Sequence, residues 1–313
     1  MILKDAAALE ALEAQTGQVE LGQSSYWRDG VQTFEVKADG AVTGASVLGM
    51  VSRKTGPIYR LMHWVLQAPF RRMGSRFSTL ADSLAIGRLI ARRQRRVYTY
   101  DLLRHSLTLA LVRHHTPLDR EDEVSAVIGD GCGMMSSHLL LAYPRRKVIT
   151  INLTKPLLLD MVYLRQAVPG AVVALVRDAA EMAEALADSG INVIALQADH
   201  AAALMAAPVG LAVNIVSMQE MDPPVVAEYF RILRGTKAAR LAFYCCNKLW
   251  KRLSDGTEVE FSQYPWREAD QIVLDEPCSW SQWIYSKTPP FWIYRRGEKR
   301  VIWHRFCWLS KDA

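Results

Sequence analysis

Hydrophobic residues recur at helical spacing through the first third of the chain. Three stretches show this spacing: 50–70, 82–93 and 100–115. Each is predicted to form a helix, and Pro69 is expected to end the first one because proline disrupts a helix interior. The helix-breaking residue Pro117 and a polar linker follow residue 115. Residues 1–120 are therefore predicted to form a helical N-terminal cap region.

From residue 121 onward, short apolar runs alternate with helical stretches. The runs lie at 123–128, 147–152, 192–197, 211–216 and 241–246. A further run at 171–176 competes with 192–197 for the place of the third strand. Strands that alternate with helices form right-handed βαβ units, so residues 121–313 are predicted to be an α/β domain with a mostly parallel sheet.

The end of the chain has a different pattern. Residues 291–296 and 300–308 are rich in aromatic and branched side chains, and Gly297 lies in the short connection between them. This arrangement is typical of a β-hairpin. A C-terminal antiparallel hairpin is therefore predicted beside the parallel sheet.

Composition sets the broad class of the protein. Half of the 313 residues are hydrophobic and 22% are charged, which suits a large packed core. The five cysteines include no CxxC pair, so structural zinc and a disulfide framework are not expected, and a reducing cytoplasm fits best. The sequence has no secretory signal and no run of about 20 apolar residues, so no transmembrane segment is expected.

Much of the formal charge of +6 comes from an arginine cluster at residues 71–96. Such a cluster can meet nucleic acid, an anionic membrane surface or an acidic substrate, or it can simply face water. Nucleic acid is not expected, because neither an aromatic-glycine RNA signature nor zinc-finger spacing accompanies the arginines. A weak contact of the 71–96 cluster with an anionic surface stays open.

Three glycines, at 129, 131 and 133, separate an apolar run from an apolar helix. Glycine at alternate positions allows a sharp turn and the close approach of a ligand. A nicotinamide or flavin fingerprint needs its third glycine at position 134, which is methionine here, and no Gly-Lys-Ser/Thr follows. The loop therefore favours a ligand without phosphate, although a tight turn with no ligand would use the same residues.

This loop resembles the glycine-rich first motif of class I S-adenosylmethionine-dependent methyltransferases. Over roughly residues 100–270 the chain is similar to a family of bacterial sugar O-methyltransferases, and the motif NIVSMQEM at 214–221 is the most specific part of the likeness. The other shared motifs are VIGDGCG, INLTKP, FYCCNK and YPW. The resemblance implies a Rossmann-like class I methyltransferase sheet and S-adenosyl-L-methionine as the cofactor.

The resemblance also implies a set of cofactor contacts. They are Gly129, Asp130, Gly131, Gly133, Asn152, Asp199, Asn214 and Ser217. Members of the family usually have an acid where this chain has Asn152, and an amide can bond two ribose hydroxyls but lacks the charge that strengthens such bonds. Asp199 would accept from the adenine amino group only if 192–197 is the third strand.

Methyl transfer to a hydroxyl needs a base as well as good positioning, because the displacement is in line and the hydroxyl is a poor nucleophile. Glu220 is the leading candidate for the base and His105 is the second. Each has a plainer interpretation: an acid favoured at a helix N-terminus, and a partly buried histidine without a chemical role. No metal is expected, because no His, Asp or Glu cluster has ligand spacing.

Seven of the nine tryptophans fall between residues 250 and 308. Sugar rings have apolar C–H faces that pack on aromatic rings, so this segment suits a glycan acceptor. Trp266 and Trp280 are the candidates for acceptor contact, because they lie in loop-like stretches. A place in the core is the alternative for both, since tryptophan buries a large area.

The sequence therefore predicts an S-adenosylmethionine-dependent O-methyltransferase that acts on a small sugar-containing metabolite or a glycan. Three alternatives stay open. They are a methyltransferase with another acceptor, a nicotinamide enzyme on a similar sheet, and a non-catalytic binding protein, for which Asn152 is the best argument.

Overall fold

The computed structural model describes residues 2–20, 22–44, 56–116, 120 and 122–312. The first residues of the predicted helix at 50–70, and residues 117–119 and 121 of the linker after residue 115, lie outside the described residues. In the part that is described, no helix is both long and apolar enough to cross a membrane.

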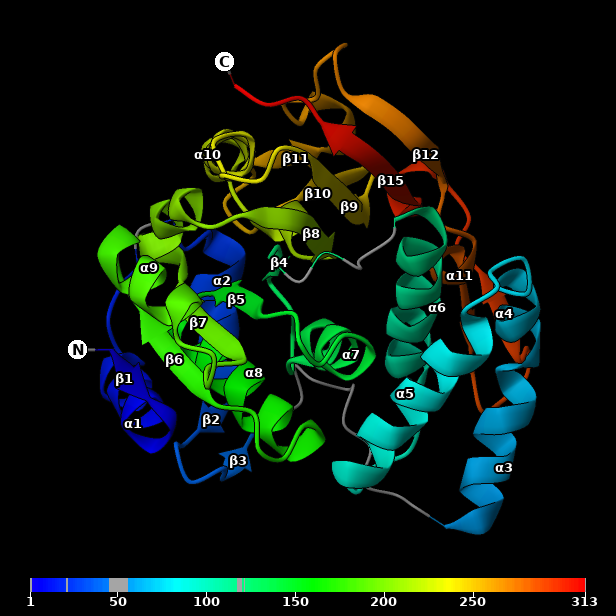
Figure 1. The fold of residues 1–313 in the computed structure, drawn as a ribbon. Helices are drawn as coiled ribbons and strands as arrows, with labels where there is room; N and C mark the ends of the chain where they lie inside the picture. The colour runs from blue at the N-terminus through cyan, green and yellow to red at the C-terminus, as the bar shows by residue number, and fades with distance from the viewer. Residues whose placement is uncertain (1, 21, 45–55, 117–119, 121, 313) are drawn as a thin grey trace.

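A nine-stranded sheet forms the centre of the described structure (Figure 1). Its strands, in spatial order, are β1 (Leu3–Lys4), β6 (Val173–Val176), β7 (Val193–Gln197), β5 (Val148–Asn152), β4 (Val124–Ile128), β8 (Val209–Ile215), β9 (Leu241–Lys248), β15 (Ile302–Leu309) and β12 (Gln271–Pro277). The six strands from β6 to β9 run parallel, and β15 runs antiparallel to both of its neighbours. The sheet is the mostly parallel, Rossmann-like α/β sheet that the sequence predicted, so the fold class is confirmed at this level.

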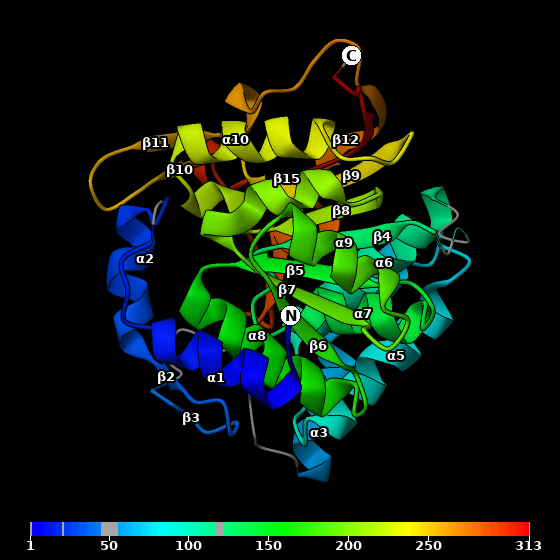
Figure 2. The ribbon, with the colours of Figure 1, turned by 60° about the vertical axis from the view of Figure 1, so that its left-hand side comes forward.

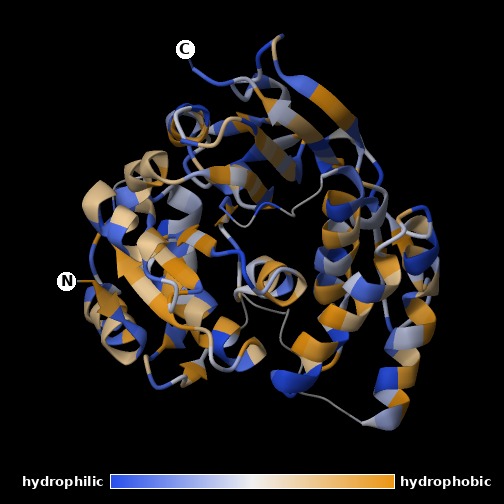
Figure 3. Ribbon diagram, in the orientation of Figure 1, coloured by the Kyte–Doolittle hydropathy of each residue, from blue (hydrophilic) through white to orange (hydrophobic). Residues whose placement is uncertain are grey.

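Helices cover both faces of the sheet, as Figures 1 and 2 show together. One face packs against α5 (Leu80–Arg93), α6 (Tyr100–His115), α7 (Met134–Ala142) and α8 (Thr154–Ala167). The other face packs against α9 (Ala179–Ala187), α10 (Pro223–Arg234) and the 3-10 helix η3 (Ala198–Ala206). The parallel strands are buried on both faces and read as nearly continuous apolar runs, which Figure 3 shows along β6 and β7.

Both competing runs are strands. The run at 192–197 forms β7, which pairs directly with β5, and the run at 171–176 forms β6 on the outer side of β7. The third-strand position therefore belongs to 192–197, which places the residues after it beside the end of β5.

The predicted C-terminal hairpin is wrong in its pairing. Strand β14 (Trp292–Tyr294) pairs with β13 (Trp283–Tyr285), whereas β15 lies between β9 and β12. The reason is burial: Ile302 and Phe306 of β15 enter the main core, which a small surface hairpin cannot offer. At this edge of the sheet the antiparallel strands are therefore β15 and β12, whereas β1 pairs antiparallel with β6 at the opposite edge.

The first third of the chain divides between two locations. Helices α3 (Pro57–Leu66), α4 (Ala68–Met73), α5 and α6 confirm the helical interpretation. Pro69 does not end a helix but lies in the first turn of α4, where its missing N–H costs nothing. In contrast, β1 joins the main sheet and α1 (Asp5–Gln15) packs on α8, so these two elements lie apart from the four helices (Figure 2). The boundary at residue 120 stays a prediction.

The remaining elements are short. Near the N-terminus lie α2 (Ser25–Gly30), η1 (Val31–Thr33), β2 (Glu35–Val36) and β3 (Val42–Thr43). After β8 come η4 (Met218–Glu220), β10 (Trp250–Arg252), β11 (Glu258–Glu260), η5 (Phe261–Gln263), α11 (Ser279–Gln282) and η6 (Glu298–Arg300). Among them, α2 and η4 contribute directly to the site.

Candidate functional site

Two adjoining cavities lie at the carboxyl ends of β4, β5 and β8. The chain leaves β4 toward β5 on one side, and β8 lies on the other, so this is the point where an open α/β sheet binds its ligands. The first cavity has a volume of about 310 Å³ and the second about 270 Å³. Five residues line both: Trp27, Gly129, Asn152, Ser217 and Glu220.

The glycines of the loop after β4 have separate structural reasons. All three have positive φ angles, of 68° at Gly129, 60° at Gly131 and 57° at Gly133. A Cβ on Gly129 would lie 1.9 Å from the Ser217 hydroxyl oxygen. A Cβ on Gly133 would lie 2.5 Å from a backbone oxygen of α8. Gly129 and Gly131 therefore face the cavities, whereas Gly133 lets α8 pack against the loop.

Asp130 holds the loop to the helix that follows it. Its carboxylate accepts hydrogen bonds from the backbone N–H groups of Met135, at 2.6 Å, and Ser136, at 2.8 Å, in the first turn of α7. The side chain is buried at the second cavity, and burial raises its pKa to about 6. The amides and the helix dipole support its charged form.

A second acid, Asp160 of α8, lies at the same cavity and was not among the predicted residues. It accepts hydrogen bonds from the Gly133 N–H at 3.0 Å and from the Asn152 amide at 2.8 Å. Burial, and then the charge of Asp130, raise the pKa of Asp160 well above its ordinary value. Its sequence signal was an aspartate inside the apolar helical run PLLLDMVYL.

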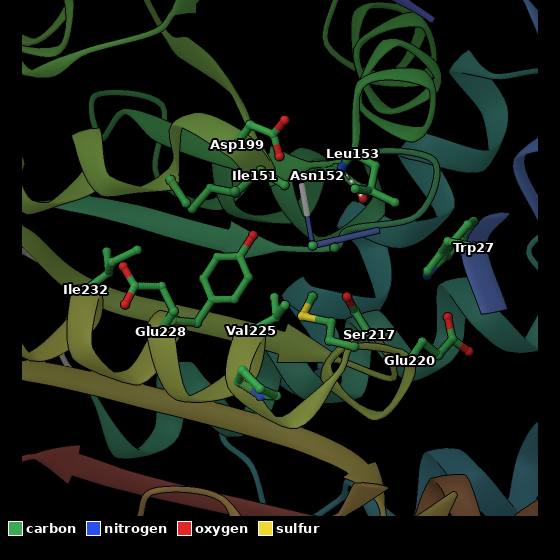
Figure 4. A pocket seen from close by; sticks show the side chains of 17 residues that line it. Trp27, Ile151, Asn152, Leu153, Asp199, Ser217, Glu220, Val225, Glu228 and Ile232 are labelled. Atoms are coloured by element: carbon green, nitrogen blue, oxygen red, sulfur yellow. Dashed lines mark hydrogen bonds between the residues drawn. The ribbon is translucent and has the colours of Figure 1, made fainter. Parts of the chain in front are cut away.

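Asn152 and Asp199 come together at the first cavity, as predicted from the position of 192–197. Asn152 ends β5, and its register partner Gln197 ends β7 directly before Asp199. Figure 4 shows Asp199 and Glu228 toward one end of this cavity, and Trp27 and Glu220 toward the other. An adenosine-sized ligand placed along this cavity would therefore meet an amide and a carboxylate.

Glu220 lies in η4 where the two cavities meet. Its carboxylate is paired with the Lys251 ammonium at 2.8 Å, and both side chains are mostly buried. Burial raises the pKa of Glu220, although the charge of Lys251 opposes this shift. The same ammonium lies 3.7 Å from the ring centroid of Tyr26, so α2 and β10 both help to hold the acid.

The second predicted base, His105 of α6, lines the second cavity only. Its Nδ1 lies 2.7 Å from the carbonyl oxygen of Asp101, so Nδ1 must donate and Nε2 is left as the acceptor. Burial lowers the pKa of His105 to about 4, which keeps the ring neutral at pH 7. Arg104, beside it, also reaches this cavity and pairs with Asp101 at 2.5 Å.

The N-terminal segment closes the cavities, which the sequence did not indicate. Tyr26, Trp27 and Phe34 line them, far along the chain from the sheet residues they face. Two contacts fix this segment: the Ser24 hydroxyl donates to the Glu220 carbonyl oxygen at 2.5 Å, and Glu20 accepts from the N–H of Thr154 at 2.8 Å. A tryptophan in the otherwise polar stretch SSYWRDG was the one local signal.

The motif at 214–221 supplies one residue that lines the cavities and one that holds the surrounding loop in place. Ser217 lines both cavities, next to Val216, a branched residue with a φ of 61° that is strained in this conformation. Asn214 is fully buried and lines neither: its amide donates to the Ile128 carbonyl at 2.9 Å, and its oxygen accepts from Met218. Asn214 therefore shapes the loop that carries Ser217.

The structure does not bring the two predicted tryptophans to the cavities. Trp266 packs edge-on against Phe230 at 4.8 Å between ring centroids, and its indole N–H donates to a backbone carbonyl. Trp280 is 1% exposed and packs against His304 at 5.3 Å. Both rings follow the alternative interpretation and serve the packing of the C-terminal region.

No group of three or more His, Cys, Asp or Glu side chains is placed to hold a metal ion within the described residues. The carboxylate oxygens of Asp130, Asp160 and Glu220 instead accept hydrogen bonds from backbone amides, an asparagine and a lysine. The chemistry that the site offers is therefore that of isolated carboxylates and aromatic walls.

Comparisons with known proteins give matches among solved structures alone. No known family matches the sequence, and no curated protein matches it. A crystal structure of the methyltransferase CalO6 is similar over 66% of this chain and 64% of its own length, just under two thirds, with 13% identity and a TM-score of 0.38. The fibrillarin/Nop5p complex is similar over 66% of this chain and 81% of its own, with 13% identity and a TM-score of 0.37.

A third solved structure is the glycopeptide N-methyltransferase MtfA complexed with S-adenosyl-L-methionine. It is similar over 61% of this chain and 82% of its own, with 11% identity and a TM-score of 0.33. Likenesses of this size carry no argument about the cofactor or the substrate of this chain. The interpretation of the site rests on its own geometry.

Proposed function

We propose that this chain is an S-adenosylmethionine-dependent O-methyltransferase that acts on a hydroxyl of a sugar or of a sugar-containing metabolite. The observation that carries the proposal is the position of Glu220, an acid with a raised pKa that lines both cavities where they meet. A donor that reaches from the first cavity into the second would meet an acceptor in the second cavity beside this carboxylate.

The first cavity fits the adenosine part of the cofactor. Apolar side chains such as Ile151 and Val225 form its walls, the Asp199 carboxylate suits an exocyclic amine, and Asn152 suits a ribose hydroxyl. Among the described residues that line this cavity, none is basic and three are acidic: Asp199, Glu220 and Glu228. Acids repel phosphate, so this lining disfavours a nicotinamide dinucleotide.

The second cavity fits the charged part of the cofactor. When bound, S-adenosylmethionine supplies an electrophilic methyl group on a cationic sulfur. The carboxyl groups of Asp130 and Asp160 lie at this cavity, and both are held in place by backbone amides. A cation beside them would favour their ionised forms, which burial alone disfavours.

Glu220 is the base that we assign, and His105 is the second candidate. A general base works best when its pKa lies near the working pH, and burial moves the pKa of Glu220 in that direction. Burial shifts the pKa of His105 in the opposite direction, down to about 4, although its Nε2 is free to accept a proton. Glu220 is therefore the better matched of the two near neutral pH.

The acceptor would rest on the aromatic residues of the N-terminal segment. Tyr26, Trp27 and Phe34 line the second cavity, and aromatic faces suit the apolar C–H surfaces of a sugar ring. These three rings take the role that the sequence suggested for Trp266 and Trp280. We place the reaction in the cytoplasm, because all five cysteines are free thiols and buried.

Titration calorimetry of the whole chain tests the proposal, with S-adenosylmethionine, S-adenosylhomocysteine, NAD and NADP as ligands. The first two should bind and the dinucleotides should not. Gly131→Val should abolish binding, because a branched side chain would fill the cavity. Gly170→Val is the matched control: Gly170 also has a positive φ, of 94°, but lies away from both cavities with open space around it.

Three outcomes would contradict the proposal. Unchanged affinity in a folded Gly131→Val protein would remove the loop from the site. Tight binding of NAD or NADP alone would favour the nicotinamide alternative. Binding of S-adenosylmethionine without methyl transfer to any of a broad set of sugars would favour a non-catalytic protein or another acceptor.

A further inference from the structure

Helix α3 exposes an apolar face. Four of its side chains are hydrophobic and strongly exposed: Ile58 at 83%, Leu61 at 60%, Trp64 at 56% and Val65 at 48%. Figure 1 shows α3 at the outer edge of the molecule, with α5 and α6 on its inner side. A contiguous apolar face of this kind on a helix usually marks a contact with a partner or a membrane.

The small hairpin of β13 and β14 extends this face. Phe291, Trp292, Ile293 and Tyr294 are each between 38% and 44% exposed. The Trp292 indole donates to the Leu66 carbonyl oxygen at the end of α3, at 2.9 Å. The Lys287 ammonium lies 4.4 Å from the ring centroid of Tyr59 on α3. We call α3 and this hairpin, residues 57–66 and 283–294, the α3–β14 surface.

A cavity of about 400 Å³ opens between α3 and α5 beside this surface. Leu61 and Trp64 form part of its apolar wall. The basic residues that line it are Arg60, Arg88, Arg92 and Arg96. Among its described lining residues none is an acid, so the cavity combines basic residues with apolar side chains.

Positive charge gathers around the cavity. Arg71 donates to the Trp64 carbonyl oxygen at 2.9 Å, and its pKa is lowered first by burial and then by the charge of Arg88. In the sequence, residues 44–81 and 277–297 contain no aspartate or glutamate. His63, which is 6% exposed, also lines the cavity, and no described residue partners its Nε2.

We propose that the α3–β14 surface docks the protein onto a bilayer that contains anionic phospholipids. The exposed indole, leucine and isoleucine side chains enter the interfacial region, and the exposed arginines of the α3–α5 cavity, Arg60, Arg88 and Arg92, contact lipid phosphates. Basic residues beside an apolar, tryptophan-bearing helix face are the combination that binds such surfaces. A second copy of the chain would bring like charges together, and nucleic acid would leave the apolar side chains in water.

Vesicle co-sedimentation of the full chain tests this inference. The protein should bind vesicles of phosphatidylcholine with about one quarter phosphatidylglycerol at least tenfold more tightly than vesicles of phosphatidylcholine alone. Binding should weaken as salt rises, because the arginine contribution is screened. Equal binding to both vesicles, or no binding to either, would overturn the proposal.

Two double variants test the apolar residues and the basic residues of the α3–β14 surface for their contribution to vesicle binding. Ile58→Glu with Leu61→Glu should lower binding about tenfold or more, whereas Ile272→Glu, a 55% exposed residue on β12, should leave it unchanged. Arg60→Glu with Arg88→Glu should also lower binding, and Lys37→Glu, on the exposed turn between β2 and β3, should not.

All of these positions are exposed, so the variants should melt with the parent, and melting curves check this. Variants of the α3–β14 surface that bind as well as the parent would overturn the proposal. Analytical ultracentrifugation adds a separate test. A parent that dimerises, with the dimer lost in the Ile58→Glu and Leu61→Glu protein, would assign this surface to self-association instead.

Discussion

The Asn152 amide donates a hydrogen bond of 2.8 Å to the Asp160 carboxylate and so ties the end of β5 to α8. The Asn152 oxygen accepts from the next backbone N–H, at 3.0 Å. Asn152, which takes the place of an acid, is therefore paired with an acid at the seventh residue of α8. A carboxylate at 152 would lie against Asp160, whose pKa is already raised.

The first prediction follows from this pair. Asn152→Asp should lower the free energy of unfolding by about 1–3 kcal/mol at pH 8, because two carboxylates would share one buried site. The loss should shrink at pH 5, since one protonated carboxyl can donate to the other. The pKa of the pair is raised in the folded protein, so its stability contribution is present at low pH and is lost as pH rises. Urea unfolding at the two pH values measures the difference.

The control is the exchanged pair. Asn152→Asp with Asp160→Asn keeps one amide and one carboxylate in contact, so it should regain most of the stability lost by Asn152→Asp at pH 8. If the double variant loses as much free energy of unfolding as the two single variants combined, residues 152 and 160 do not act as a pair.

The second prediction concerns Gly133. Gly133→Ala should lower the free energy of unfolding by about 2–4 kcal/mol, because the added Cβ meets the Asp160 carbonyl oxygen and the φ is positive. Gly170→Ala shares the positive φ but has open space around it, so it should cost only about 1 kcal/mol. Thermal unfolding of both proteins checks this, and equal losses would show that α8 does not press on the loop.

Features that depend on neighbouring residues could be predicted from the sequence. The buried parallel strands are continuous apolar runs, and the glycines of the loop after β4 follow one such run directly. Residues at strand ends meet at one edge of a parallel sheet, so Asn152, Asp199 and Ser217 reached the cavities as expected.

Features that depend on contacts between residues far apart in the chain could not be predicted from the sequence. Ser24 bonds to Glu220 across 196 positions, and nothing near Ser24 in the sequence indicates that contact. The aromatic residues were misjudged for the same reason. Trp266 and Trp280 lie in loop-like sequence but meet core partners from other elements, whereas Trp27 lies in a polar stretch but lines both cavities.

The third prediction concerns the ion pair at the junction of the cavities. Lys251→Met leaves the buried Glu220 carboxylate without its cation, so the pKa of Glu220 should rise further. Such a group favours folding below its unfolded pKa and disfavours it as pH rises through the folded value. The loss of stability should therefore be larger at pH 8, about 2–4 kcal/mol, than at pH 5.

Arg252→Met is the matched control for this variant. Arg252 is the next residue of β10, and both Arg252 and its partner Glu258 are exposed. Such surface pairs contribute little, so the control should unfold like the parent at both pH values. A Lys251→Met protein with the same loss at pH 5 and pH 8 would show that Glu220 does not carry the charge.

The fourth prediction tests the same carboxylate through catalysis and rests on the proposed function. Glu220→Gln keeps the shape of the side chain and removes the proton acceptor. If Glu220 is the base, turnover should fall by about 10²–10⁴-fold while S-adenosylmethionine affinity stays nearly unchanged. His105→Ala should then retain most of the activity. The opposite result, normal turnover in Glu220→Gln and lost turnover in His105→Ala, would transfer the role to His105.

The last prediction uses the charge of the second cavity. S-adenosylmethionine carries one positive charge more than S-adenosylhomocysteine, so the ratio of their dissociation constants isolates the effect of that charge. The pKa of Asp130 is raised to about 6, so its carboxyl is mostly protonated at pH 5 and ionised at pH 7.5. The preference for S-adenosylmethionine should therefore increase roughly three- to tenfold between these pH values. In Asp130→Asn the preference should depend less on pH than in the parent, because only Asp160 of this pair then titrates at the cavity. A parent whose preference is the same at both pH values would place the cofactor's sulfur away from Asp130.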